Sequence, residues 1–189
     1  MAPVDDIVVP DDLPPTVAAA LEEAAVRFPM VEALVDGDLR LTYPQLLDAV
    51  DVAARALIAT GIEHGDRVAI WAPNIAEWVI AACAIHRAGA VLVPLNTRFK
   101  GTEAEYILTK SRARLLFTVS DFLDTDYTAM LGDRSRLPDL AHVVVLRGPE
   151  RTDTIDWSTF LARADDVPTD AGARRAAAIS PDDLSDVLF

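Results

Sequence analysis

The feature that most constrains the fold is a repeated alternation of short apolar runs with longer amphipathic segments. The apolar runs are residues 68–71, 90–94, 115–119 and 143–146. None of them alternates apolar with polar residues, and such a run is typical of a strand that is buried on both faces. Helical patterns separate most of the runs, which predicts βαβ units. We therefore expect an α/β fold with a mostly parallel, doubly wound sheet and flanking helices.

The amphipathic segments carry the start and stop signals of helices. Residues 16–28 place apolar side chains at helical spacing, and Pro29 ends the segment. A longer helix is predicted over residues 43–60 and a short one over 157–164. Three helix starts are indicated by the capping-box pattern, in which a residue that accepts a backbone N–H is followed three positions later by Glu or Gln. The pairs are Thr42 with Gln45, Asn74 with Glu77, and Thr102 with Glu105.

Three further segments complete the predicted organisation. Residues 31–41, which contain Asp36-Gly37, favour a small antiparallel hairpin near the N-terminus, because Asp-Gly suits a tight turn with positive φ. Residues 165–178 are polar and rich in Ala and Arg, and we interpret them as a linker. Residues 1–13 carry four aspartates and are expected to be a flexible acidic lead-in, which leaves residues 14–189 as the folded domain.

Charge and composition exclude several classes of function. The net charge is −13, and the basic residues are scattered, so we expect no binding to nucleic acid. No window reaches 18 consecutive apolar residues, so we expect no membrane span. The single cysteine, Cys83, excludes an internal disulfide and fits a reducing compartment, and the first residues lack a signal-peptide pattern. We therefore expect a cytoplasmic protein.

The common catalytic and nucleotide-binding motifs are absent from the sequence. No glycine-rich phosphate loop, nucleophile elbow or cluster of His and Cys with metal-ligand spacing occurs, so we expect no metal site. Of the three histidines, His86 is kept as a candidate because it lies near the end of an apolar helix, with core packing as the alternative. No residue of this chain is assigned as catalytic.

Residues 86–98, HRAGAVLVPLNTR, are the most informative segment. They resemble the helix–Gly–Ala–strand–Pro–Leu–Asn motif of the adenylate-forming superfamily, which contains acyl-CoA and aryl-CoA ligases, peptide-synthetase adenylation domains and luciferases. Residues 41–46, 65–78 and 180–189 agree with that family in order and spacing. Within the superfamily the chain is most similar to actinobacterial ligases of fatty acids and of the propanoate side chain of a steroid-ring fragment.

The resemblance implies an ATP-dependent carboxylic acid:CoA ligase that uses Mg²⁺. The carboxylate would first attack ATP to give an acyl-adenylate and pyrophosphate, and the CoA thiol would then displace AMP. In that family the strand that matches residues 186–189 leads into a phosphate-binding loop, and nothing follows Phe189 here. The resemblance thus implies that residues 14–189 are the N-terminal part of the large domain, truncated before this loop. We expect the fragment alone to be inactive and to bind none of these cofactors.

The resemblance also suggests roles for two more residues. Arg98 could contact CoA or its phosphates, with a surface or packing role as the alternative. Trp78 could line the acyl pocket, with core packing as the alternative, and His86 joins it as a candidate substrate-binding residue. Two other functions stay open: a non-catalytic α/β binding or interaction domain, and an adenylation domain that loads a carrier protein instead of CoA.

Overall fold

A parallel five-stranded sheet forms the centre of the computed structural model, which describes residues 13–149 and 151–189. All but the last residue of the predicted acidic lead-in lies outside these ranges. The strand order is β4-β3-β5-β6-β7, and every neighbouring pair is parallel. The strands are β3 (Arg67–Trp71), β4 (Val91–Pro94), β5 (Leu115–Val119), β6 (His142–Arg147) and β7 (Ile155–Asp156).

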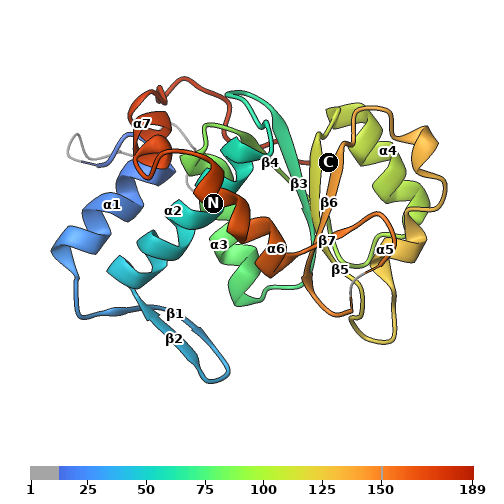
Figure 1. The fold of residues 1–189 in the computed structure, drawn as a ribbon, viewed down its shortest axis with the longest axis horizontal. Coiled ribbons are helices and arrows are strands. Elements are labelled where there is room, and N and C mark those ends of the chain that lie inside the picture. Colours follow the sequence, from blue (N-terminus) through green and yellow to red (C-terminus); the bar gives the residue numbers. More distant parts are fainter. Residues whose placement is uncertain (1–12, 150) are drawn as a thin grey trace, which may run out of the picture.

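Helices cover both faces of this sheet, as the doubly wound prediction requires. Figure 1 shows α1, α2, α3, α6 and α7 on one side of the sheet, and α4 and α5 on the other. The α-helices are α1 (Val17–Arg27), α2 (Tyr43–Ala59), α3 (Ala76–Arg87), α4 (Gly101–Ser111), α5 (Tyr127–Met130), α6 (Trp157–Ala162) and α7 (Ala171–Ala177). Two 3-10 turns are η2 (Arg134–Arg136) and η3 (Arg163–Asp166).

The central strands are buried on both faces, which confirms the interpretation of the apolar runs. Every residue of β5 is buried, and β3 is buried from Val68 onward. Phe117 of β5 packs edge-on against Phe160 and Trp157 of α6, with ring centroids 5.2 and 5.8 Å apart. Burying apolar side chains on both sides of each strand supplies the main driving force for this layered arrangement.

The N-terminal hairpin is confirmed and forms a sheet of its own. Strands β1 (Glu32–Asp36) and β2 (Leu39–Thr42) pair antiparallel, apart from the larger sheet. Gly37 has a φ of +59° in the connecting turn, a conformation that glycine adopts at little cost.

Of the three predicted capping boxes, the first is placed correctly and the other two are wrong. Gln45 Oε1 accepts a hydrogen bond of 2.9 Å from Thr42 N, and α2 begins directly after Thr42. The N-cap of α3 is Ile75, without a side-chain cap, because Glu77 pairs with Arg147 of β6 instead of reaching back to Asn74. Helix α4 begins at Gly101 because the carboxylate that caps it belongs to Glu103, which accepts from Lys100 N at 3.0 Å.

The predicted linker over residues 165–178 is also wrong. Its C-terminal half forms α7, because alanine and arginine are strong helix formers and Arg174 pairs with Asp170 one turn earlier at 3.1 Å. Tertiary contacts hold this helix in place: Ala171 is buried, and Arg175 Nη1 donates to Ala88 O at 3.2 Å. Strand β7, which pairs with Val144 and Val145 of β6, was not predicted from the sequence.

Candidate functional site

The crossover connections point to the carboxyl ends of β3, β4 and β5 as the place for a ligand. Strand β3 lies between β4 and β5, and the connections that leave β3 and β4 pass over opposite faces of the sheet (Figure 1). In open α/β sheets, ligands bind at such a reversal of strand order, outside the carboxyl ends of the strands. The loops that follow β3 and β4 meet there.

Trp71, the last residue of β3, holds these loops together. It is fully buried, and its indole Nε1 donates to Asn96 O at 3.1 Å. Its ring lies edge-on to Tyr127 of α5, with centroids 4.8 Å apart, and Tyr127 in turn donates from its hydroxyl to Thr97 O at 2.9 Å. Two aromatic side chains thus bind the backbone of the loop after β4 and fix its position relative to β3.

A cavity of about 410 Å³ lies beside this loop. Trp78, half-buried near the start of α3, lines it together with Asn74 and Thr97. The lining contains no charged side chain. It therefore fits an uncharged group, such as the body of a carboxylic acid, better than a triphosphate, whose charge requires cationic partners.

Arg98 lies next to this cavity and is exposed. Its backbone N donates to Asn96 Oδ1 at 2.9 Å, so the Asn96 side chain satisfies the loop backbone. Within residues 13–149 and 151–189 the Arg98 guanidinium makes no hydrogen bond or ion pair. Thr97, the residue before Arg98, lines the cavity.

His86 is separated from Trp78 by most of the length of α3. The two residues are eight positions apart, which is about 12 Å along the helix at 1.5 Å per residue. His86 lines a different cavity, of about 180 Å³, between α3 and residues 179–185. Its side chain is 11% exposed, and its Nε2 lies 3.7 Å from Asp186 Oδ1. Burial lowers the pKa of His86, and the charge of Asp186 opposes this only in part, so the imidazole is neutral at pH 7.

An ion-pair cluster braces the start of α3 beside the first cavity. Arg147, at the end of β6, donates from Nε to Glu77 Oε1 at 3.0 Å and also pairs with Asp36 in the hairpin. Asp36 accepts from Ala76 N, the first amide of α3, at 3.0 Å. Glu77 Oε2 is buried and accepts no hydrogen bond, and Arg147 Nη2 at 2.8 Å compensates its charge.

Sequence reasoning missed these supporting residues because their partners are far away along the chain. Tyr127 contacts a carbonyl 30 positions earlier, and Arg147 contacts a carboxylate 111 positions earlier. Neither contact leaves a local pattern. In the part of the chain that the structure describes, no three His, Cys, Asp or Glu side chains come together as a metal site, and no helix is both long and apolar enough to cross a membrane.

The family described as AMP-binding enzyme matches residues 21–189 of this chain. Two relatives, each named 3-[(3aS,4S,7aS)-7a-methyl-1,5-dioxo-octahydro-1H-inden-4-yl]propanoyl:CoA ligase, come from Mycobacterium tuberculosis and Rhodococcus jostii. The first is 49% identical over 92% of this chain and 34% of its own length, and the second is 45% identical over 93% and 35%.

Solved structures agree with this match. The anthranilate CoA ligase AuaEII, determined in complex with anthranoyl-AMP, superposes with a TM-score of 0.71 at 29% sequence identity. The superposition covers 84% of this chain and 30% of that protein. The chain therefore spans about a third of the length of the proteins that it matches.

Proposed function

Because this chain belongs to the AMP-binding enzyme family, we propose that it is part of an ATP-dependent carboxylic acid:CoA ligase. The observation that carries the proposal is its identity of 49% and 45% to two relatives that are both named as CoA ligases. The reaction would join a carboxylate to AMP, release pyrophosphate, and then transfer the acyl group to the CoA thiol. By analogy with the same relatives, the acid would be a bicyclic propanoate.

The cavity next to Trp78 supports a role in holding the acid. Its lining is uncharged but largely polar, and Trp78 offers the flat apolar surface against which a ring or alkyl body could pack. The loop after β4 is held by Trp71 and Tyr127, so the cavity is already shaped before a ligand enters. Preorganisation of this kind lowers the cost of ordering a ligand.

The position of Arg98, directly after the cavity-lining Thr97, supports a role in binding a phosphate-bearing substrate near the same cavity. Arg98 is exposed and has no carboxylate partner among the described residues, so an incoming CoA phosphate would not have to displace an ion pair. His86 is our second candidate for contact with the acid, in its separate cavity. As a neutral imidazole it could accept or donate one hydrogen bond without carrying charge.

The metal and the nucleotide need groups that the described residues do not bring together. Mg²⁺ prefers carboxylate oxygens, and no cluster of three potential ligands is present among residues 13–149 and 151–189. When bound, Mg²⁺ would stabilise the charge of the transferring phosphoryl group. We therefore assign to this chain the positioning of the acid and of CoA, and no step at the phosphorus.

The direct test is acid-dependent ATP–pyrophosphate exchange, measured on this chain alone and on the complete protein that contains it. We expect exchange and CoA-dependent AMP release from the complete protein with a bicyclic propanoate or a medium-chain acid. We expect neither from the 189-residue chain. If AMP release requires a carrier protein instead of CoA, the acyl acceptor is a carrier protein and not CoA. A complete protein that is folded but shows no exchange with any acid would overturn the proposal.

A variant of the complete protein tests the role of Arg98. Arg98→Gln is expected to raise the KM for CoA about tenfold, the effect of losing one charge-assisted contact, with little change in exchange activity. Lys100→Gln removes the same charge two positions away and is the matched control. An equal rise in KM for both variants would show that only the general charge of this loop matters.

A further inference from the structure

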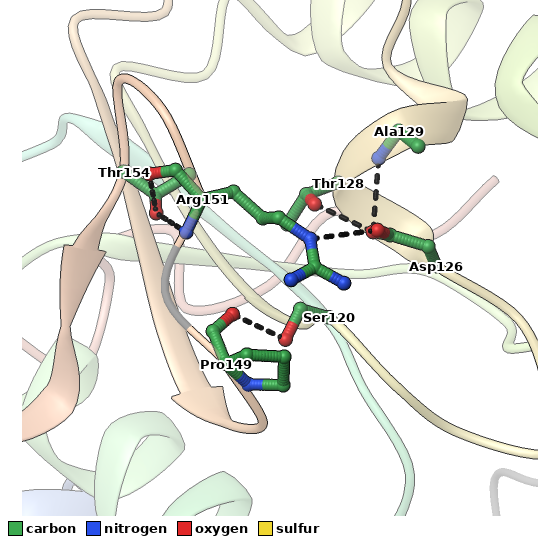
Figure 2. Close-up of polar contacts among 7 residues, drawn as sticks. All are labelled: Ser120, Asp126, Thr128, Ala129, Pro149, Arg151 and Thr154. Atoms are coloured by element: carbon green, nitrogen blue, oxygen red, sulfur yellow. Dashed lines mark hydrogen bonds and ion pairs between the residues drawn. The ribbon is translucent and has the colours of Figure 1, made fainter.

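A second group of polar side chains joins the loops that follow β5 and β6. Figure 2 shows Ser120 donating to Pro149 O, at 2.7 Å, and the Arg151 side chain reaching from one loop to Asp126 in the other. The bond from Arg151 Nε to Asp126 Oδ2 measures 2.8 Å, and Arg151 N donates to Thr154 Oγ1 at 3.0 Å. Both the backbone and the side chain of Arg151 are therefore held in place.

These loops border a cavity of about 240 Å³ that is separate from the one beside Trp78. Two guanidinium groups line it, those of Arg134 and Arg151, together with hydroxyls from Thr128, Thr152 and Thr154. Its single carboxylate is that of Asp126. The lining thus has a net charge of +1, although the net charge of the whole chain is −13.

The two arginines keep most of their hydrogen-bonding capacity unused. Each guanidinium carries five N–H groups. Arg151 uses Nε for Asp126, and Figure 2 shows both of its terminal nitrogens without a partner among the residues drawn. Arg134 uses Nη1 to donate to Asp153 O at 2.6 Å. Within residues 13–149 and 151–189, no other hydrogen bond from these two side chains is present.

Asp126 does not neutralise the cavity, because its charge is already committed. Thr128 Oγ1 donates to Asp126 Oδ1 at 2.6 Å and Ala129 N at 3.1 Å, in addition to the bond from Arg151. Burial opposes ionisation of this carboxyl, but the three hydrogen bonds outweigh it and hold its pKa below the usual value. Asp126 therefore balances Arg151 and leaves the charge of Arg134 without a carboxylate partner in the described part of the chain.

We propose that Arg134 and Arg151 bind the phosphate group of a small molecule in this cavity. Planar guanidiniums match the oxygens of a phosphate with paired N–H groups, and a threonine hydroxyl such as that of Thr152 can donate a further hydrogen bond. The inference rests on this geometry alone and not on the proposed ligase activity, which assigns no part to the cavity. Phosphate could come from the free ion or from a nucleotide, and the two sources are distinguishable.

The test is a titration of the chain with inorganic phosphate, pyrophosphate and AMP at constant ionic strength, followed by amide NMR. We expect saturable shifts at the amides of Thr128, Thr152 and Thr154 and none at Ala25 of α1, which lies on the other side of the sheet. Tighter binding of AMP than of phosphate would identify a nucleotide as the source, whereas equal binding would identify the free ion. Arg134→Gln and Arg151→Gln are each expected to weaken binding about tenfold.

Arg174→Gln is the matched control, because it removes the same charge from an exposed pair on α7. It is expected to leave binding unchanged. The proposal is overturned if the wild-type amides do not shift, if Arg174→Gln weakens binding as much as the other two variants, or if acetate shifts the same amides with equal affinity. If an arginine variant lacks the dispersed spectrum of a folded chain, the wild-type titration decides alone.

Discussion

Arg87 shows how a single charged residue in an apolar helix can join several helices. Its side chain is 6% exposed, and its guanidinium pairs with Asp51 of α2, at 2.9 Å, and with Glu22 of α1. Gly172 of α7 packs so close that a Cβ there would lie 2.5 Å from Asp51 Oδ1. Four helices, α1, α2, α3 and α7, therefore meet at one charged cluster.

We expect Arg87→Gln to lower the free energy of unfolding by about 2–3 kcal/mol. Breaking a fully buried pair costs about 3–5 kcal/mol, and the cost is smaller here because the Glu22 side chain is 46% exposed and can regain water. Urea denaturation measures the change. Arg27→Gln, which breaks an exposed pair with Glu23, is the control and should cost less than about 1 kcal/mol. Equal losses in the two variants would contradict the prediction.

At the scale of the element, helix α6 depends on the residue that precedes it. Asp156 ends β7 and is also the N-cap of α6, where its Oδ1 accepts from Ser158 N and Thr159 N, both at 3.0 Å. The Ser158 hydroxyl donates to the same oxygen. These bonds hold the pKa of Asp156 far below its usual value, and the bond from the Ser158 hydroxyl has the largest effect. One carboxylate therefore couples the end of the sheet to the start of a helix.

Asp156→Ala is expected to destabilise the protein by about 1 kcal/mol at pH 7, the usual cost of losing an N-cap. Because the folded pKa is depressed, the contribution of Asp156 is present above the unfolded pKa of about 4 and is lost as the pH falls through the folded value. The difference between the wild type and Asp156→Ala should therefore narrow from pH 7 towards pH 2 in thermal denaturation. A difference that is independent of pH would contradict this explanation. Asp156→Asn, which keeps an oxygen acceptor but not the charge, is the control.

At the scale of the whole molecule, residues 180–189 cover the exposed edge of the sheet. Leu92 N of β4 donates to Ser185 O at 2.8 Å, and Val187 N donates to Leu92 O at 2.9 Å. His64, in the turn before β3, pairs with Asp183 at 2.9 Å and fastens the same segment. Without this cover, β4 would present unpaired backbone groups, which promote edge-to-edge association.

Removal of residues 180–189 should therefore expose β4 without unfolding the sheet. We expect faster hydrogen exchange at the Leu92 amide and unchanged exchange at Ala69 in the central strand β3, because only the edge loses its partner. Light scattering should show greater self-association. Equal loss of protection at both amides would mean that the segment stabilises the whole sheet and not its edge alone.

The α/β architecture and the family could be predicted from the sequence, because both depend on patterns among neighbouring residues. Apolar runs such as residues 115–119 specify buried strands wherever the sheet places them. Local patterns failed where a side chain had a choice of partners. Glu77 pairs with Arg147 and does not cap α3 as predicted. The segment that we interpreted as a linker contains α7, which is held by the packing of Ala171 against the other helices.

Only the tertiary structure decided which of the candidate residues lie together. Trp78 and Arg98 come to the same end of the sheet, whereas His86, at the far end of α3, lies in another cavity. The strand order and the crossovers set these distances, and no spacing along the chain encodes them. The same holds for Arg134 and Arg151, which come from segments on either side of β6 and share a cavity because two loops close on each other.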